Sequence, residues 1–533
     1  MVKPLKIDNT VHARISDYVQ EYALQQPDQD ALVTNNERIN YRVLNDQVVQ
    51  CAKALMALGV IKGDRVAMLC APNSEFYVVF LATVSIGGIW LGLNPKYSIE
   101  EYHHAINDAK PKVLVSMIEF SERKYARDLT CLYDEYDFIE HLVIISAVQT
   151  SLLPNSTHYD DFLSSGSNIT DAQYQQVNST VQRLDPALIV YTSGSTGKPK
   201  GAMLSHYGLC FGATVQSKHF NIEQPSIICN MPINHVACVA DICCTTLVKG
   251  GTLHFQDNFD PALMLQTIAT EKIKIWAGVP TMFLLQLKQA EFKEYDLSSL
   301  ELIMWGGSAM PEAAIKQLQS LNTRLMTLYG MTETSAHTIY SAENSSLESL
   351  RDKIGKPEPQ MPCRIVNEQG ELCPTGEQGE IQFKGQYLML GYYNQPEATK
   401  IAFNPDGWFH TGDLGYFDDN GDITLVGRMS DMYKSGGYNI YPREIELILE
   451  SHTDIDTAIV VSIPDALFQE VGIAFVIGKN SESINNTQLV NFCKTVLANY
   501  KVPKKIIFLK EFPMLPIGKV DKVQLKKLAM ESK

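Results

Sequence analysis

Residues 192–201, TSGSTGKPKG, place four hydroxyl side chains and three glycines within one short run, directly after the apolar stretch PALIVY. Closely spaced hydroxyls and backbone N–H groups form a cradle for an anion, and Lys198 or Lys200 can add a positive charge. The run is not a P-loop, because Thr192 and Pro199 stand where that motif needs glycine and a hydroxyl, and no G-x-G-x-x-G is present. The sequence predicts a phosphate-binding loop, with a flexible surface loop as the alternative.

The elements that would position this loop are apolar runs ending at Gly, Pro or Asn. They alternate with helical patterns from about residue 50 to about 340, which is typical of parallel sheets wrapped by helices. Ligands bind such sheets at the carboxyl ends of the strands. Four runs lead into polar segments there, at 191–201, 278–281, 306–311 and 329–334. The expected strands are RVAMLCAPN, KVLVSMI, HLVIISA, PALIVYTSG, KIWAGVP, LELIMWGG and LMTLYGMTE.

The pattern changes twice after this region. From about residue 355, short runs and turns such as GEIQFKGQYLMLGYYN predict a compact β subdomain. After Arg428, helix EIELILES, strands TAIVVSIP and IAFVIGK, helix QLVNFCKTVLANY and strand KKIIFLKEF predict a separate α+β unit. The expected fold class is α/β, with a large N-terminal domain of helix-wrapped, mostly parallel sheets plus a β subdomain, and a small mobile α+β C-terminal domain.

Composition narrows the class of protein. The chain has 533 residues, which favours two or more domains, and no stretch approaches the roughly 18 apolar residues of a membrane span. The first residues lack a secretory h-region, so a cytoplasmic protein is expected. Eleven cysteines without CxxC pairs or zinc spacing indicate reduced thiols, and Cys243 and Cys244 are expected to pack in a helix. A net charge of −15 argues against nucleic acid as a partner.

Five segments together carry a family resemblance: the 192–201 loop, LYGMTET at 328–334, GWFHTGD at 407–413, the run GRMSDMYKSGGYNIYPREIE, and PIGKVDK at 516–522. In order and spacing they resemble the acyl-adenylate-forming superfamily of acyl-CoA synthetases, peptide-synthetase adenylation domains and luciferases. The resemblance implies two half-reactions: a carboxylic acid and ATP give acyl-AMP and pyrophosphate, and a thiol then displaces AMP. It also implies an adenylation domain at 1–427, a hinge at 428–431 and a mobile domain at 432–533.

The resemblance further implies how ATP, Mg²⁺ and CoA are held. Tyr329 would lie against adenine, Asp413 would accept both ribose hydroxyls, and Arg428 would be a second ribose and phosphate contact. The hinge holds Ser430, where the family usually has Asp or Lys, followed by Asp431. The residues expected to contact ATP or CoA are Thr192, Ser193, Gly194, Ser195, Gly197, Lys198, Lys200, Gly307, Ser308, Ala309, Tyr329, Gly330, Met331, Thr332, Asp413, Arg428, Lys434, Gly436, Gly437 and Asn439.

Four residues are implied to act in catalysis. Glu333 resembles the family's Mg²⁺ contact, with Thr192 as a second candidate, and a single carboxylate suffices because Mg²⁺ keeps most of its waters. Lys519 matches the lysine that bridges the reacting carboxylate and the nucleotide, where negative charge develops. His235 resembles the aromatic gate between the acyl pocket and the pantetheine tunnel. Thr196 lies in the loop that wraps the β- and γ-phosphates.

The expected pocket for the acid is mostly apolar. It offers no Arg or Lys for a second carboxylate and no Asp for an amino group, which disfavours dicarboxylates and amino acids. Trp305 is expected to limit acyl length, which favours medium-chain or aryl acids. The expected walls are His235, Val236, Cys238, Val239, Val279, Pro280, Trp305 and Gly306, with Gly307 and Met331.

Three functions are consistent with these motifs. The SGGYN segment favours a CoA ligase, which would act on a small carboxylic acid, ATP and CoA. An acyl-AMP ligase or stand-alone adenylation enzyme that loads a carrier protein is the second. A nucleotide-binding sensor without catalysis is the third, and the presence of Glu333, Asp413, Arg428 and Lys519 argues against it.

Overall fold

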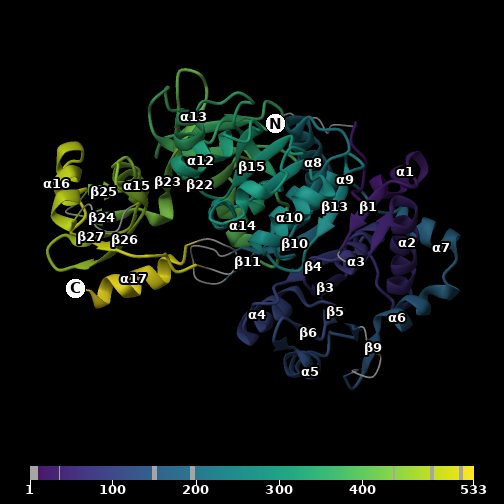
Figure 1. The fold of residues 1–533 in the computed structure, drawn as a ribbon. Helices are drawn as coiled ribbons and strands as arrows, with labels where there is room; N and C mark the ends of the chain where they lie inside the picture. Colours follow the sequence, from purple (N-terminus) through teal and green to yellow (C-terminus); the bar gives the residue numbers. More distant parts are fainter. Residues whose placement is uncertain are drawn as a thin grey trace.

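The computed structural model describes residues 10–34, 37–146, 153–192, 199–435, 438–479, 485–514 and 520–532. Two large sheets form the body of the molecule (Figure 1). Five neighbouring strand pairs of the first sheet, from β16 to β1, are parallel. In spatial order its strands are β18 (Lys356–Pro357), β17 (His337–Tyr340), β16 (Arg324–Gly330), β15 (Leu302–Gly306), β14 (Ile275–Gly278), β12 (Ser226–Cys229), β13 (Thr252–Phe255), β1 (Asp30–Val33) and β2 (Arg38–Asn40).

The second sheet is parallel from β10 to β9, and an antiparallel hairpin extends its edge. In that hairpin Thr192, the last residue of β10, pairs with Lys200, the first residue of β11. Residues 193–198 therefore leave and re-enter the sheet at the same ends of these two strands. The spatial order is β21 (Gly391–Tyr392), β11 (Lys200–Ser205), β10 (Pro186–Thr192), β4 (Ile89–Leu93), β3 (Arg65–Leu69), β5 (Val113–Met117), β8 (His141–Ile145) and β9 (Ser156–His158). A small separate hairpin joins β6 (Glu119–Phe120) and β7 (Arg123–Lys124).

Side chains on successive strand residues point to opposite faces of a sheet. Both faces of each sheet carry buried apolar residues, and helices cover both faces. In β15, Leu302 and Met304 join the core between the sheets, whereas Ile303 and Trp305 join an outer core. The helices of the N-terminal part are α1 (Asp17–Gln25), α2 (Tyr41–Ala57), α3 (Ser74–Ser85), α4 (Ile99–Ala109), α5 (Ala126–Glu135), α6 (Tyr159–Ser165), η2 (Gly166–Asn168), α7 (Asp171–Asn178), α8 (His206–Phe220), η3 (Ala237–Cys244), α9 (Thr245–Leu247), α10 (Pro261–Glu271), α11 (Pro280–Leu287), η4 (Phe292–Glu294), α12 (Glu312–Gln319), η5 (Thr332–Thr334), α13 (Leu347–Asp352) and α14 (Pro396–Ala402).

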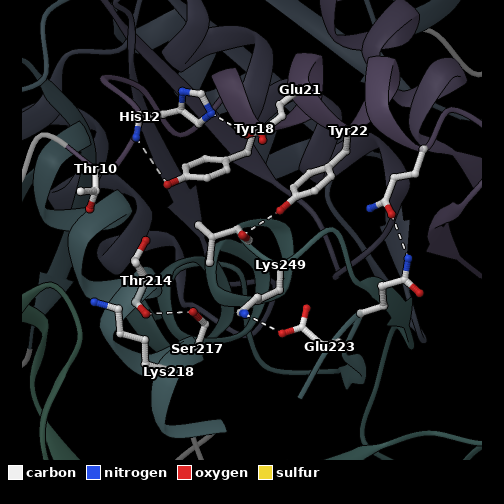
Figure 2. A pocket seen from close by; sticks show the side chains of 13 residues that line it. Thr10, His12, Tyr18, Glu21, Tyr22, Thr214, Ser217, Lys218, Glu223 and Lys249 are labelled. Carbon is white, nitrogen blue, oxygen red and sulfur yellow. Dashed lines mark hydrogen bonds and ion pairs between the residues drawn. The ribbon is translucent and has the colours of Figure 1, made fainter. Parts of the chain in front are cut away.

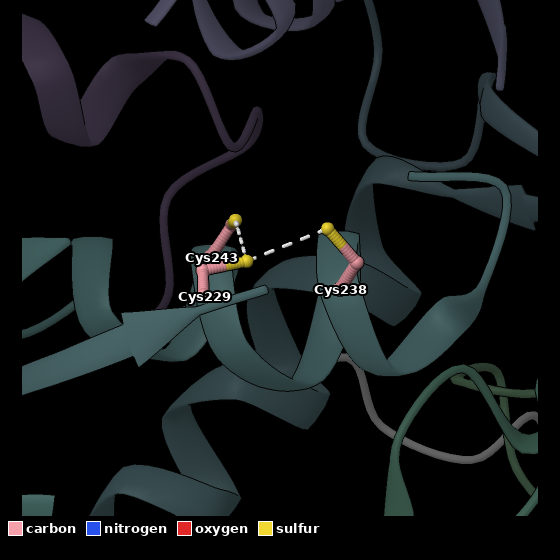
Figure 3. A group of neighbouring side chains, drawn as sticks. All are labelled: Cys229, Cys238 and Cys243. Carbon is pink, nitrogen blue, oxygen red and sulfur yellow. Dashed lines mark hydrogen bonds between the residues drawn. The ribbon is translucent and has the colours of Figure 1, made fainter. Parts of the chain in front are cut away.

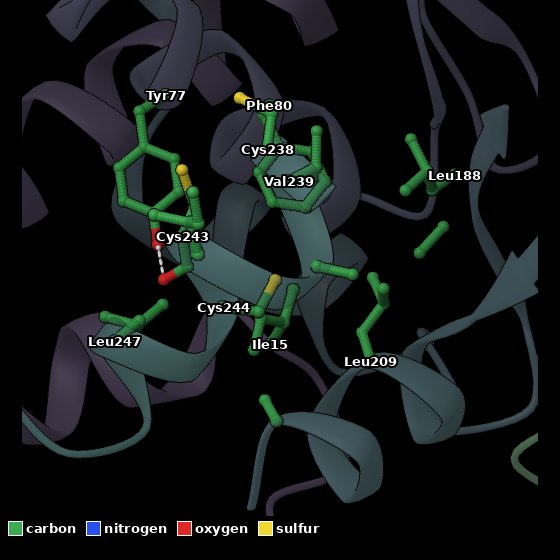
Figure 4. Packing of buried hydrophobic residues seen from close by; sticks show 14 of the residues in the cluster. Ile15, Tyr77, Phe80, Leu188, Leu209, Cys238, Val239, Cys243, Cys244 and Leu247 are labelled. Atoms are coloured by element: carbon green, nitrogen blue, oxygen red, sulfur yellow. Dashed lines mark hydrogen bonds between the residues drawn. The ribbon is translucent and has the colours of Figure 1, made fainter. Parts of the chain in front are cut away.

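The central core lies between the two sheets. Helix α3 is buried along almost its whole length, as expected for a helix that is apolar all round. Tyr77 and Phe80 of α3 belong to the same buried cluster as Leu188 of β10, Leu209 of α8 and Val239 of the π-helix η3 (Figure 4). Elements from both sheets therefore meet in one core, which gives the body its layered helix–sheet–helix–sheet–helix arrangement.

The remaining residues form two smaller units. One is an antiparallel sheet of β19 (Cys363–Val366), β20 (Gly379–Phe383), β22 (Phe409–Phe417) and β23 (Ile423–Arg428). The other has its own cores and stands apart on the left of Figure 1. It follows η6 (Met429–Asp431) and contains β24 (Tyr433–Ser435), β25 (Tyr438–Ile440), α15 (Pro442–Glu450), β26 (Ile455–Asp465), β27 (Gln469–Gly478), α16 (Asn486–Val496), β28 (Lys505–Phe508) and α17 (Lys522–Glu531).

The expected fold class is confirmed, and so is each of the seven expected strands of the α/β region. The β24–β25 hairpin and α17 were not anticipated. No helix in the described ranges is both long enough and apolar enough to cross a bilayer.

Candidate functional site

Three of the predicted polar segments leave the same edge of the first sheet. Strands β14, β15 and β16 are parallel neighbours, with Gly278 opposite Trp305 and Gly306 opposite Leu328. Gly307 then turns the chain with φ of +83°, a conformation that favours glycine. Gly307, Ser308 and Ala309 follow as an exposed segment. The structure therefore assembles these segments at the carboxyl ends of the strands, where a ligand is expected.

Three expected nucleotide contacts form one cluster. The Tyr329 hydroxyl donates a hydrogen bond to Asp413 Oδ2 at 2.6 Å, and Arg428 Nε lies 3.0 Å from Asp413 Oδ1. Asp413 is only 3% exposed, so its charge needs these partners. The Asp413 carboxylate raises the pKa of Arg428, while burial and then Asp413 raise the pKa of Tyr329. The cluster joins β16 of the first sheet to β22 and β23 of the β subdomain.

Glu333, the expected Mg²⁺ contact, is oriented by a second tyrosine. Tyr392 donates a hydrogen bond from its hydroxyl to Glu333 Oε1 at 2.9 Å, and the Met389 N–H donates to the Glu333 carbonyl at 2.8 Å. Lys200 Nζ lies 5.1 Å from the centroid of the Tyr392 ring. Tyr392 thus brings a cation from the rim of the 193–198 loop close to the carboxylate, although 59 residues separate it from Glu333.

The segment that follows Glu333 rests on a close helix contact. Ser335 has φ of +59°, and the chain there touches α8 at two glycines. A Cβ on Gly208 would lie 2.7 Å from Ser335 Oγ, and a Cβ on Gly212 would lie 2.5 Å from the Ala336 Cβ. Only glycine allows this approach, so α8 determines where Glu333 emerges from the sheet.

His235 lies just before η3, and its ring is held by the helix start. Its Nδ1 accepts a hydrogen bond from the Ala237 N–H at 3.1 Å, so a neutral imidazole carries its proton on Nε2. Lys434 is paired across the β24–β25 hairpin with Asn439 and is exposed. These positions are the described parts of the expected gate and of the expected CoA contact.

Several expected site residues lie outside the described residues. They belong to residues 193–198, to the two residues between β24 and β25, and to the PIGKVDK segment, and the side chain of Asn439 is also not described. The residues are Ser193, Gly194, Ser195, Thr196, Gly197, Lys198, Gly436, Gly437 and Lys519.

The expected walls of the acyl pocket do not form one group. Cys238 and Val239 are fully buried in the core between the sheets. Trp305, 1% exposed, packs in the outer core with Phe283, and Val279 packs against the same core. Trp305 therefore packs on the face of β15 opposite Met304, and this packing argues against its expected role as the limit on acyl length, which stays a prediction.

A buried polar network near Gly306 was missed by the sequence analysis. His337 Nδ1 lies 2.7 Å from Gln216 Oε1 and 3.3 Å from Asp241 Oδ1. Gln216 is fully buried and Asp241 is 6% exposed. The available signal was a single acidic residue in the apolar run VACVADICC, but nothing in the sequence pairs it with His337. The network therefore places a buried carboxylate behind His337, which the sequence analysis did not anticipate.

Three buried cysteines also meet at η3 (Figure 3). Cys229 Sγ lies 3.5 Å from Cys238 Sγ and 3.9 Å from Cys243 Sγ. Burial raises the pKa of Cys238 and Cys243 well above the usual range, so these thiols stay protonated. Among the described residues no histidine or carboxylate completes the group. The cluster is packing of reduced thiols, as expected for Cys243 in a helix.

A polar recess of about 750 Å³ opens between α1 and the far end of α8 (Figure 2). Among its charged lining residues, His12 pairs with Glu21 at 2.5 Å and Lys249 pairs with Glu223 at 3.1 Å. None of the expected site residues belongs to its lining. The recess is thus separate from the carboxyl edge of the first sheet.

Comparison with known proteins identifies the family. The sequence profile described as AMP-binding enzyme matches residues 19–393, and that of the AMP-binding enzyme C-terminal domain matches residues 444–519. A mitochondrial medium-chain acyl-CoA ligase of Bos taurus is 31% identical, over 94% of this chain and 85% of that protein. A feruloyl-CoA synthase of Amycolatopsis sp is 31% identical, over 95% of this chain and 97% of that protein. ATP-bound MatB from Rhodopseudomonas palustris has a TM-score of 0.84 at 27% identity, over 97% of this chain and 99% of that chain.

The chain belongs to the AMP-binding enzymes, and both the main and the C-terminal domain of that family are represented. It is an acid–thiol ligase of the acyl-CoA synthetase class, which forms an acyl-AMP from ATP and passes the acyl group to CoA. The resemblance seen in the five sequence segments is therefore confirmed.

Proposed function

We propose that this ligase uses Mg²⁺ and ATP to activate a medium-chain or aryl carboxylic acid in the cytosol. The observation that carries the nucleotide part is the cluster of Tyr329, Asp413 and Arg428. A carboxylate has about four lone-pair sites, so Asp413 can accept ribose hydroxyls in addition to its present partners. A relative that acts on medium-chain acids and one named for feruloyl-CoA support the acid class. Eleven unpaired cysteines suit a reducing compartment.

Glu333 fits a magnesium contact. One of its oxygens is held by Tyr392, which orients the carboxylate, and Mg²⁺ needs only one or two protein oxygens beside phosphate and water. When bound, the metal would neutralise charge on the phosphate oxygens. Thr192 and Lys200 flank the phosphate loop, and Lys200 would add a positive charge beside Tyr392.

The two half-reactions would use two positions of the C-terminal domain, residues 432–533, turning at the hinge 428–431. Lys519 would serve adenylation, and the Lys434–Asn439 hairpin would face the site for transfer to CoA. Lys522 Nζ lies 2.6 Å from Asp431 Oδ2 in a half-exposed ion pair beside this hinge. Such pairs contribute only about 0 to 1 kcal/mol, so this one is a small barrier to rotation.

The proposal is tested by a pyrophosphate-release screen over carboxylic acids, with and without CoA, and mass spectrometry of the products. We expect pyrophosphate and an acyl-CoA from medium-chain or aryl acids, and a requirement for Mg²⁺. If acyl-AMP accumulates with CoA present and is consumed only when a carrier protein is added, CoA is not the acceptor.

A further inference from the structure

The network of His337, Gln216 and Asp241 has a defined hydrogen-bonding direction. Gln216 Nε2 donates to the Asp241 main-chain carbonyl at 2.8 Å, which can only accept. The Gln216 amide is thereby oriented, and its Oε1 faces His337 Nδ1 at 2.7 Å. An amide oxygen only accepts, so Nδ1 of His337 must carry the proton. In the neutral ring, Nε2 is then an acceptor.

His337 Nε2 faces the carboxyl end of β15. A Cβ built on Gly306 would lie 3.4 Å from this nitrogen, so the ring borders the segment where the acyl group is expected. The His337 side chain keeps 15% of its surface exposed, while Gln216 behind it is fully buried. The only polar atom of the ring not used by Gln216 is therefore presented at the site.

Asp241 adds a second acceptor. Its Oδ1 is buried and makes no hydrogen bond to any residue in the described part of the chain, although His337 Nδ1 lies 3.3 Å away. A buried polar atom without a partner costs on the order of 1–3 kcal/mol, so its retention calls for a ligand. Both unused atoms are acceptors, and a bound group that satisfies them must be a donor.

We propose that the acyl group of the substrate carries a hydroxyl, which donates a hydrogen bond to Nε2 of His337 beside Asp241. This rests on the proposed function, because it assumes that the acid lies beside Gly306. An apolar acid would leave these acceptors buried and unpaired, so the pocket discriminates against it. His337 is the contact residue, while Gln216 is a positioning residue that sets its tautomer.

The test compares matched acids that differ only in the hydroxyl. The pairs are 4-hydroxycinnamate with cinnamate and 8-hydroxyoctanoate with octanoate, and pyrophosphate release gives kcat/KM for each. We expect the hydroxylated member of at least one pair to be preferred by about tenfold to a hundredfold, and the pair that responds distinguishes an aryl from an alkyl hydroxyl. A ratio of one or less in both pairs overturns the proposal, as does a tenfold preference for the matching amino acids.

Variants separate recognition from folding. His337→Phe keeps a ring and removes the acceptor, so the ratio of kcat/KM between the hydroxylated and the unsubstituted acid should fall to within about threefold of unity. Asp241→Asn should reduce the preference in the same direction, and Ile242→Val on the same helix should preserve it. An unchanged preference in both folded network variants overturns the proposal. If the wild type releases no pyrophosphate with any carboxylic acid, the proposed function itself fails.

Discussion

The Tyr329 hydroxyl donates a hydrogen bond of 2.6 Å to Asp413 across 84 residues of sequence. This bond connects β16 of the first sheet to β22 of the β subdomain, and the ion pair with Arg428 holds Asp413 from β23. Asp413 is a buried carboxylate, 3% exposed, and these two interactions offset part of the cost of burying its charge. In the proposed function Asp413 holds the ribose, so the pair would couple stability to nucleotide binding.

Tyr329→Phe should remove this donor and keep the ring. We expect the unfolding free energy to fall by about 1 to 3 kcal/mol and the KM for ATP to rise, because the carboxylate proposed to bind the ribose loses its orientation. Urea unfolding and initial rates at varied ATP measure both effects. An unfolding free energy and a KM for ATP equal to those of the wild type would show that this hydrogen bond does not orient Asp413.

Glu333→Gln should weaken the magnesium site while leaving the Tyr392 hydrogen bond possible. We expect pyrophosphate release to fall roughly 10² to 10³-fold, as for loss of one charged group at a transition state, and its half-saturating Mg²⁺ concentration to rise. Tyr392→Phe keeps the carboxylate and serves as the matched control with a smaller loss. An unchanged Mg²⁺ dependence in Glu333→Gln would remove Glu333 from the metal site.

Lys519→Ala should cut acyl-AMP formation by roughly 10² to 10⁴-fold, because a cation beside developing charge in a dry site contributes several kcal/mol. The same variant given preformed acyl-AMP and CoA should make thioester near the wild-type rate. Gly437→Leu should do the reverse, slowing transfer to CoA and sparing adenylation. Equal losses in both steps for Lys519→Ala would contradict domain alternation.

Trp305→Leu should create a void in the outer core and leave the preference among acids unchanged. The side chain is 1% exposed, so we expect a loss of roughly 2 to 4 kcal/mol in the unfolding free energy. Denaturation and kcat/KM for hexanoate, octanoate and decanoate are the measurements. A shift towards longer acids would return Trp305 to the acyl pocket.

His206 should make stability depend on pH. Burial lowers its pKa to about 3, below the usual value near 6.5 in an unfolded chain. As pH falls through this window the unfolded state binds one more proton, so stability is fully present above about pH 6.5 and declines below it. His206→Phe should reduce that decline by up to about 1.4 kcal/mol per pH unit, measured by urea midpoints from pH 7 to pH 5. If the urea midpoints of the wild type and of His206→Phe decline in parallel between pH 7 and pH 5, His206 does not cause the pH dependence.

The sequence by itself determined the order of elements and the class of chemistry. A buried parallel strand such as 302–306 is a short apolar run, and the glycines and hydroxyls of residues 192–201 predict an anion-binding loop. Both signals are local, so neither depends on what packs against them. The same holds for the motifs that led to the correct family.

The tertiary structure alone decided which side chains meet. Tyr392 reaches Glu333, and His337 reaches Gln216 across 121 residues, because strands and helices distant in the chain are neighbours in the layers. The face to which Trp305 points depends on the strand register, since one residue of shift reverses every side chain. Close packing at Gly208 and Gly212 then placed the Glu333 turn, a contact that no periodicity encodes.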